Sequence, residues 1–523
     1  MPIEEGFHPG HNPWAVALTV TLATFMEVMD TSIANVSLPH IAGGLSAGQD
    51  ESTWVLTSYL VSNAIVLPIS AWLSDRFGRK RFYMSCVALF TLSSFLCGLA
   101  PSLGALVFFR ILQGIGGGGL GPSEQAILAD TFPPAKRGMA FAVYGMAVVL
   151  APAIGPTLGG WITDNYSWRW IFYVNVPFGI LSLFLSSFMI KDPPHIAEAQ
   201  KKSKRSPIDF TGIVLVATGL GALQVVLDKG QRDDWFGSGF ITSFTIIAVC
   251  AIVAFIFWEL RQDHPIVNLR LFKNPNFAVS NVLMLVLGVT LFGSTVLIPQ
   301  FLQIELGYTA QAAGEVLTPG GFAILLLMPM IGFLVSRVDA RYLIGFGFLI
   351  SSAALFNMTN LTLGIDYTTA MWWRVFQAAG MAFLFVPINT ISYNGMPPEA
   401  SNQVSGMVNL MRNIGGSIGI SAVTTMIARG QQSHLMYFAR HLYEGNPKLQ
   451  SMLAGLNATF GARSAPADAT RLSYSRVTQL VDRQASVLAY IDTFWFMGML
   501  CVLAMGCLFF LKKNKPGQRA MAH

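Results

Sequence analysis

Long apolar runs of the sequence contain several ionisable residues, among them Glu27, Asp30, Arg110 and Glu124, and a charge inside such a run is costly and needs a reason. Glu27 and Asp30 lie three residues apart in the first run, so a helix there would carry both carboxylates on one face. Arg110 and Glu124 lie in the fourth run. A carboxylate beside a movable cation is a proton switch, because burial disfavours its charged form and the cation stabilises it. These residues therefore indicate proton-dependent chemistry.

Asp30 and Arg110 are expected at the same depth. The first run would cross from inside to outside and the fourth run would return, so Asp30, about 24 Å along its helix, shares the outer half with Arg110. We interpret both as proton-coupling residues, although a static ion pair that fixes helix packing is the alternative. Glu27 and Glu124 are further candidates for proton coupling. They could instead meet a cationic substrate or face a water-filled cavity.

The elements that would position these residues are membrane-spanning helices. Of the 523 residues, 53% are hydrophobic and 11% are charged, whereas soluble domains carry about 25% charged residues. The apolar residues form runs of about twenty, the length that crosses about 30 Å of hydrocarbon. We therefore predict an all-α integral membrane protein. Its fourteen spans are expected at 14–39, 54–73, 82–100, 105–130, 138–162, 170–190, 210–228, 238–259, 277–304, 312–335, 342–361, 368–395, 403–428 and 485–511.

The basic residues indicate orientation. The formal net charge is +6, but Lys and Arg form short clusters between apolar runs and no extended basic face, which argues against nucleic-acid binding. Most of them fall on one side if the N-terminal residues 1–13, the linker 191–209 and the tail 512–523 are cytoplasmic. The short outer loops hold only Arg169, Lys229 and Arg232. This asymmetry follows the positive-inside rule.

An internal repeat divides the chain. Matching residues lie 264 positions apart: Arg110, Gln113 and Gly116 match Arg374, Gln377 and Gly380, while Asp75, Pro133 and Pro134 match Asp339, Pro397 and Pro398. We predict a six-helix bundle at 14–190, two extra helices at 210–259 and a second six-helix bundle at 277–511. Parallel repeats of this kind place a solute site near the midplane, between halves that rock against each other.

Residues 71–81 join the second and third runs on the expected inner side. Gly78 permits a tight turn, and Asp75 at the start of a helical segment would interact favourably with its positive end. Arg76 and Arg79 belong to a basic cluster that would keep this loop inside. We interpret the loop as a topology signal and, in addition, as a conformational latch.

The fifth run is rich in small residues. Gly145, Gly155, Gly159 and Gly160 would let neighbouring helices approach closely. Pro156 would bend the run. A static interface and a flexing gate fit this spacing equally well.

Polar side chains on otherwise apolar runs are candidate substrate contacts. They are Tyr59, Asn63, Gln300, Gln303, Asn389 and Asn394. Ordinary interhelical hydrogen bonding is the alternative for each of them. Arg412 and Asp492 lie nearer the ends of their runs, and we interpret them as snorkelling or capping residues.

One expected outer connection, 429–484, is long and of mixed charge. Apolar residues recur at helical spacing within 435–443 and again within 474–481. We expect two amphipathic helices, the second running into the last span. They could lie on the membrane surface or dock a partner outside the membrane.

Taken together, these residues resemble the major facilitator superfamily. Residues 71–81 are similar to its cytoplasmic loop motif, with Ala71 in place of the usual glycine. Residues 110–114 resemble the fourth-span motif whose Arg is implicated in proton transfer, and residues 145–160 resemble the fifth-span motif of antiporters. The first-span residues 29–39 resemble the fourteen-span drug:proton antiporters. Residues 168–177 and 409–416 most resemble the EmrB branch of that group.

The resemblance implies a proton-coupled antiporter that exports hydrophobic and amphipathic molecules across the inner membrane of a Gram-negative bacterium. It implies a periplasmic membrane-fusion adaptor and an outer-membrane channel as partners, and no cofactor. A fatty-acid or lipid exporter of the same fold is the alternative. A membrane-embedded lipid-modifying enzyme would need a cluster of catalytic groups at one depth, and none of the eight histidines lies deep in a span. A channel would need no proton coupling.

Overall fold

The computed structural model describes residues 11–512 except 195, 197, 199, 201–207, 264, 444, 463 and 464. Within these residues the chain is helical, without strands. Almost all of the predicted cytoplasmic ends, and most of the basic linker 191–209, lie outside the described residues.

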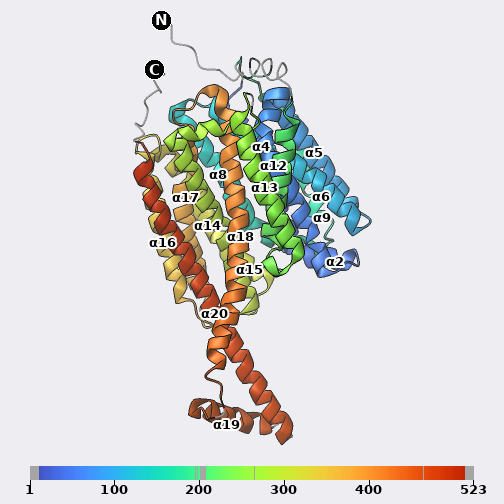
Figure 1. Ribbon diagram of the computed structural model, residues 1–523, viewed down its shortest axis with the longest axis vertical. Helices are drawn as coiled ribbons and strands as arrows, with labels where there is room; N and C mark the ends of the chain where they lie inside the picture. The colour runs from blue at the N-terminus through green and yellow to red at the C-terminus, as the bar shows by residue number, and fades with distance from the viewer. Residues whose placement is uncertain are drawn as a thin grey trace.

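The first group of helices holds the candidate proton-coupling residues. Its members are α1 (Pro13–Val36), α2 (Leu38–Gly44), α3 (Gln49–Ser52), α4 (Trp54–Phe77), α5 (Arg79–Leu99), α6 (Leu103–Gly117), α7 (Leu120–Thr131), α8 (Pro134–Asn165), α9 (Trp170–Tyr173) and α10 (Asn175–Met189). Two further helices, α12 (Phe210–Lys229) and α13 (Gly239–Arg261), pack on each other, and α12 packs on α4. In Figure 1 the first group lies beside a second group of helices, which begins with α14 (Pro275–Ile304).

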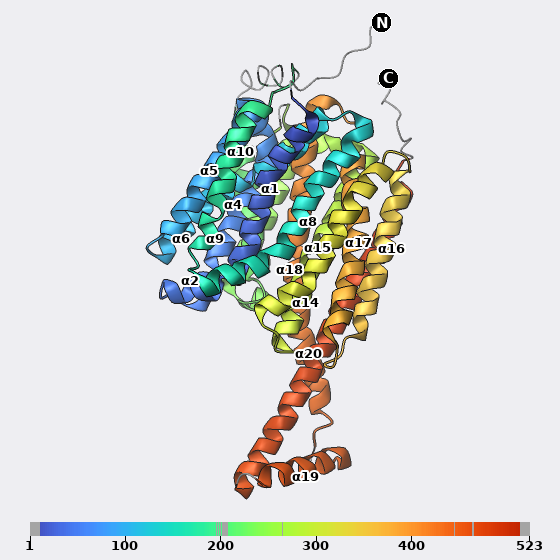
Figure 2. The same cartoon turned by 180° about the vertical axis from the view of Figure 1, so that it is seen from behind.

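A second group of helices follows along the chain. It comprises α14 (Pro275–Ile304), α15 (Ala310–Leu334), α16 (Ala340–Asn357), α17 (Tyr367–Ser392), α18 (Ser401–Ala439), α19 (Pro447–Gly461) and α20 (Pro466–Gly506). Short 3-10 turns stand at Trp235–Gly237, Leu269–Lys273, Met358–Asn360, Pro398–Ala400 and Cys507–Phe510. Figure 2 shows α8 beside both α1 and α15, so α8 joins the two groups.

Polar caps begin several of these helices. The side chains of Asn12, Ser102 and Thr309 each accept a hydrogen bond from a backbone N–H in the first turn of α1, α6 and α15. At the C-terminal end of α4, Gly78 has φ +90°, a conformation that favours glycine. This glycine allows the chain to turn directly from α4 into α5.

The structure supports most, but not all, of the fourteen predicted spans. Twelve described helices are long and apolar enough to cross a membrane, and α8, bent by 43° between Pro134–Pro152 and Ile154–Asn165, makes a thirteenth. Helix α18, which contains the predicted span 403–428, is 39 residues long but falls short in hydropathy. Its buried positions are rich in Gly, Ser and Asn, so its polarity meets other helices and not lipid. The fourteenth span stays a prediction.

The segment 429–484 differs from expectation in its helices. Residues up to Ala439 continue α18 without a break, and the unexpected helix α19 precedes α20. Helix α20 runs from Pro466 through the last predicted span, as expected for the second amphipathic helix. Figure 1 shows α18 and α20 passing beyond the bundle, with α19 across the far end of the extension.

Candidate functional site

Glycines bring α6 against its neighbours and so place Arg110. A Cβ on Gly114 would collide with Ser62 Oγ of α4, and a Cβ on Gly116 would lie 2.7 Å from the Phe90 nitrogen of α5. Only glycine leaves room for these backbones to approach so closely. Arg110, one turn before Gly114, is thereby held in the space between α1, α4 and α6, where it is 0% exposed.

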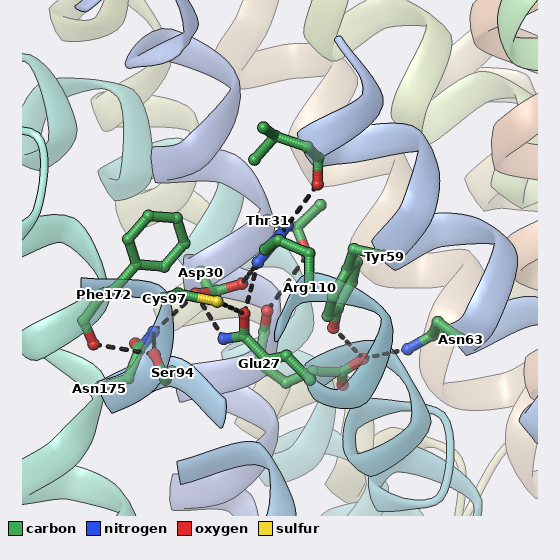
Figure 3. A network of polar contacts seen from close by, with 12 residues as sticks. Glu27, Asp30, Thr31, Tyr59, Asn63, Ser94, Cys97, Arg110, Phe172 and Asn175 are labelled. Atoms are coloured by element: carbon green, nitrogen blue, oxygen red, sulfur yellow. Dashed lines mark hydrogen bonds and ion pairs between the residues drawn. The ribbon is translucent and has the colours of Figure 1, made fainter. Parts of the chain in front are cut away.

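Asp30 and Arg110 form a direct ion pair. Arg110 Nη1 lies 2.6 Å from Asp30 Oδ2, and Asp30 is only 2% exposed. Arg110 Nε also donates to the Val55 carbonyl at 3.0 Å. Figure 3 shows the two side chains pointing toward each other from α1 and α6. The charge of each group is therefore balanced inside the protein, where a single unpaired charge would be costly.

Two amides complete the shell around the Asp30 carboxylate. Gln113 Nε2 donates to Asp30 Oδ1 at 3.0 Å, and Asn175 Nδ2 donates to the same oxygen at 2.7 Å. Asn175 is held in place by a 3.1 Å bond to Ser94 Oγ. Neither amide was predicted from the sequence to belong to the site, although Gln113 recurs as Gln377 beside the second arginine of the repeat. With Arg110, these groups give the carboxylate three donors.

Glu27 forms a second centre on the same face of α1. Its Oε1 accepts from Tyr59 Oη at 3.3 Å and from Asn63 Nδ2 at 3.1 Å. The Tyr59 ring lies 4.3 Å from the Arg110 guanidinium carbon, within cation–π range. Glu27 is half-buried whereas Asp30 is buried. Tyr59 thus contacts both centres, and Figure 3 shows this arrangement.

Glu124 stands apart from the ion pair. It lies on α7, fully buried, and accepts a short hydrogen bond from Thr24 Oγ1. Within the described part of the chain, its other oxygen, Oε1, has no hydrogen-bond partner. The structure therefore places Glu124 against α1 but provides no direct contact between Glu124 and either Asp30 or Arg110.

The other predicted substrate contacts are not brought to Tyr59 and Asn63. Gln300 is half-buried and Gln303 is exposed near the end of α14. Asn389 is buried and donates to the Phe385 carbonyl of its own helix. Asn394 lies after α17, where its carbonyl accepts from Asn274 at 3.4 Å. None of these four is bonded to the network around Glu27 in the contacts of the described residues.

Residues of α18 connect this network to the second group of helices, and one interpretation from the sequence was wrong. Arg412 does not snorkel toward a membrane surface: it is 7% exposed and lies 3.5 Å from Tyr144 Oη. Its neighbour Asn413 donates to Asn63 Oδ1 at 3.5 Å. Asp492, by contrast, has a side chain 58% exposed and pairs with His434. Arg412 is polar and buried because α18 packs against other helices and not against lipid.

The loop at 71–81 contacts the second group directly. Asn402 Nδ2, in the first turn of α18, donates to Asp75 Oδ1 at 2.5 Å. Asp75 lies in the last turn of α4, so the expectation that it begins a helical segment was wrong. Arg76 lies over the ring of Trp72, 5.9 Å from its centre.

Arg79 forms a second connection at the same end. It is 1% exposed and lies 2.6 Å from Asp130 Oδ2. The other oxygen of Asp130 accepts from Ser401 Oγ at 3.0 Å. The first turn of α18 is therefore bonded to α4 and, through Asp130, to α5, so this end of the molecule is tied across the two groups.

Small residues let α8 approach α1 on one side and α17 on another. A Cβ on Gly155 would collide with Ser32, and one on Gly159 would lie 3.0 Å from Ile33, both on α1. A Cβ on Gly145 would lie 2.7 Å from the Phe385 ring of α17, in the other group. Gly160, in contrast, has nothing within 4 Å of that position.

Pro156 accounts for the bend of α8. A proline cannot donate to the carbonyl four residues earlier, and its ring crowds that carbonyl. Here this is the Pro152 carbonyl, at the 43° bend, and Ser32 Oγ donates to it at 3.4 Å.

Comparisons with known proteins agree with this architecture. A model described as Major Facilitator Superfamily matches residues 20–420. "Multidrug export protein EmrB" of Escherichia coli (strain K12) is 36% identical over 501 residues, covering 95% of each chain. "Fatty acid resistance protein FarB" of Neisseria gonorrhoeae is 38% identical over 442 residues, covering 84% of this chain and 86% of that protein.

A solved structure of the proton:xylose symporter XylE, bound to 6-bromo-6-deoxy-D-glucose, aligns with a TM-score of 0.59 at 15% identity. The alignment covers 96% of this chain and 97% of that one, and at this identity it shows the fold alone. The predicted fold class and the predicted EmrB-like relatives are confirmed. The chain belongs to the major facilitator superfamily.

Proposed function

We propose that this protein is a proton-coupled antiporter that exports hydrophobic and amphipathic drugs and other toxic small molecules across the inner membrane. The observation that carries the proposal is the buried pair of Asp30 and Arg110, tied to the half-buried Glu27 through Tyr59. Relatives over almost the whole chain are named multidrug export proteins, which supports the same function.

Protonation of Asp30 is the proposed driving step. A proton on Asp30 removes its negative charge, so the ion pair with Arg110 becomes a weaker hydrogen bond from the guanidinium to a neutral carboxyl group. Arg110 keeps its bonds to the Gln113 amide oxygen and the Val55 carbonyl, at 2.8 and 3.0 Å. The guanidinium is then free to shift toward these acceptors, away from α1. Relative movement of α1 and α6 would follow from the altered charge balance.

Glu27 is the proposed entry to this pair. It is the more accessible of the two acids of α1, and a cationic or polar group bound there would displace Asn63 or Tyr59. Because the Tyr59 ring faces Arg110, such a displacement would be transmitted to the ion pair. Glu124 is a further proposed proton site, since its buried Oε1 lacks a partner.

The remaining predicted residues take proposed roles around this centre. Tyr59 and Asn63 are proposed substrate contacts, and Gln300, Gln303, Asn389 and Asn394 are retained as weaker candidates for the same role. In the loop, Asp75, Arg76, Gly78 and Arg79 form the proposed latch. Gly145, Gly155, Pro156, Gly159 and Gly160 form the proposed flexing surface of α8. We also propose that bundles 14–190 and 277–511 rock against each other, with 210–259 as an added helix pair.

The proposed partners are a periplasmic membrane-fusion adaptor and an outer-membrane channel. The extension that carries α19 supports this, because it projects beyond the bundle (Figure 1). It holds an open apolar hollow of about 300 Å³ whose lining includes Phe438 of α18, Met452 of α19 and Leu480 of α20. Both termini would be cytoplasmic, so that the extension lies on the outer side.

The test is transport by the purified full chain in proteoliposomes under an imposed pH gradient, with several chemically distinct substrates. Wild type should accumulate substrate in proportion to the gradient, and Asp30→Asn should not. Asp492→Asn is the matched control, because it makes the same change at an exposed acid of α20. Gradient-driven transport by Asp30→Asn at the wild-type rate would reject the mechanism. Conductance without pH dependence would indicate a channel.

A further inference from the structure

The second group of helices contains a counterpart of the arginine site. Arg374 on α17 is 4% exposed. Its Nη1 donates to Gln377 Oε1 at 2.9 Å and to Ser294 Oγ at 3.1 Å, and its Nη2 donates to Thr295 Oγ1 at 3.3 Å. The corresponding bond from Arg110 to Gln113 measures 2.8 Å. The arginine and glutamine are therefore arranged alike in the two halves.

In the second half, a neutral residue stands at the position that corresponds to Asp30. The offset of 264 that relates Arg110 to Arg374 also relates Asp30 to Ser294. Each arginine contacts the residue at that position, but the contact is an ion pair in the first half and a bond to a neutral hydroxyl in the second. No carboxylate of the described residues is paired with Arg374.

An unsatisfied amide marks where the acid would be. In the first half, Gln113 Nε2 donates to the Asp30 carboxylate. In the second half, Gln377 is 0% exposed and its Nε2 has no hydrogen-bond partner among the residues that the structure describes. A buried donor left unpaired, next to a buried cation left without a counter-ion, is costly on both counts. One carboxylate would satisfy both groups at once.

We propose that Arg374, Gln377 and Ser294 bind the carboxylate of an amphipathic anionic substrate, for which a long-chain fatty acid serves as the probe. The second half keeps the two kinds of donor that hold the Asp30 carboxylate in the first half, an arginine guanidinium and a glutamine amide. The Ser294 hydroxyl stands where the first half has the acid. Thr295, which is half-buried, is the most open of the arginine's partners and marks the side of approach. The inference rests on the proposed export function and names a substrate class for it.

Ser294→Asp provides the sharpest test, because it supplies the missing carboxylate from the protein itself. It should compete with the ligand for Arg374 as Asp30 occupies Arg110. Ser294→Asn is the matched control of similar size without the charge. Transport in proteoliposomes is compared for a long-chain fatty acid, its methyl ester and a lipophilic cation. We expect Ser294→Asp to lower transport of the acid about tenfold or more while the ester and the cation change about twofold or less.

The variant Arg374→Gln is an independent test of the proposed site. It should raise the KM for the fatty acid about tenfold and leave the KM for the ester unchanged, since the ester carries no charge to pair. Loss of acid and ester transport to the same extent in both variants would show a purely structural arginine and overturn the proposal. Unchanged transport of the acid by Ser294→Asp would overturn it as well.

Direct binding separates this proposal from the proposed function. Equilibrium binding of the fatty acid to detergent-purified wild type and Arg374→Gln tests the site even in a protein that transports nothing. Selective loss of acid binding in Arg374→Gln supports the site whether or not a pH gradient drives export. Binding of chloride at the wild-type site, with no competition by the fatty acid, would contradict the assignment to a substrate carboxylate. Absence of gradient-driven transport of every substrate would reject the antiporter and leave the binding result standing.

Discussion

The ring of Tyr59 lies 4.3 Å from the guanidinium carbon of Arg110. The hydroxyl of the same tyrosine donates to Glu27, at 3.3 Å. A single buried side chain of α4 is therefore in contact with the ion pair of Asp30 and with the more accessible acid of the same helix. Movement of Tyr59 would alter both centres together.

Two substitutions of Tyr59 separate its contacts. Tyr59→Phe keeps the ring over Arg110 and removes the bond to Glu27, so the initial rate of gradient-driven transport should fall about threefold. Tyr59→Leu removes both contacts and should lower it about thirtyfold. Initial rates measured across a range of pH in proteoliposomes give the comparison. Equal rates for the two variants would show that the ring over Arg110 contributes nothing to coupling.

The ion pair should also matter for stability. Asp30→Ala leaves Arg110 buried and unpaired, which should lower the free energy of unfolding by about 3–5 kcal/mol. The double variant with Arg110→Met removes both charges and should recover most of this loss without recovering transport. Thermal unfolding of the purified protein in detergent measures both effects. If the double variant is no more stable than Asp30→Ala, the buried charge is not the cause of the loss.

The bond between Asp75 and Asn402 should hold the latch closed. Asn402→Ala removes the donor, so the α4 and α18 ends should separate more often. Spin labels at the exposed positions Phe77 and Glu399, with Cys250 and Cys507 replaced by serine, report the distance across this end. We expect a larger share of long distances in Asn402→Ala. Lys136→Gln, an exposed charge removed at the same end, is the control and should match wild type.

The close approach of α8 to α1 depends on position within the glycine-rich segment. Gly155→Ala would press a methyl group against Ser32 and should destabilise the protein by about 1–3 kcal/mol. Gly160→Ala meets open space and should be neutral or stabilising by up to about 1 kcal/mol. Thermal unfolding in detergent compares the two. A similar loss in both variants would point to backbone flexibility and not to the helix contact.

The depth of charged residues could be read from the sequence where a run is strongly apolar. Asp30 and Arg110 were placed in the same part of the membrane from helix rise and direction, and the structure pairs them directly. Helix α18 could not be read in this way, because its Gly, Ser and Asn residues lower its hydropathy. Arg412 was interpreted as a snorkelling or capping residue from its position nearer the end of the run 403–428, although it is buried beside Tyr144.

Contacts between distant segments could not be predicted from the sequence. Asp75 and Asn402 are 327 residues apart, and no local pattern relates them. Asn175 was overlooked because an amide near a helix start has many ordinary explanations, and only the fold shows that it meets Asp30. The repeat provided one usable signal, since Gln113 and Gln377 recur with their arginines, but the meaning of Ser294 required the side-chain contacts.

Proton release on substrate binding tests the central claim most directly. Purified protein in weakly buffered detergent solution, with a pH-sensitive dye, should release protons when an exported substrate is added. Asp30→Asn should bind the substrate and release none. The same proton release from Asp30→Asn as from wild type would contradict the claim that Asp30 carries the transported proton.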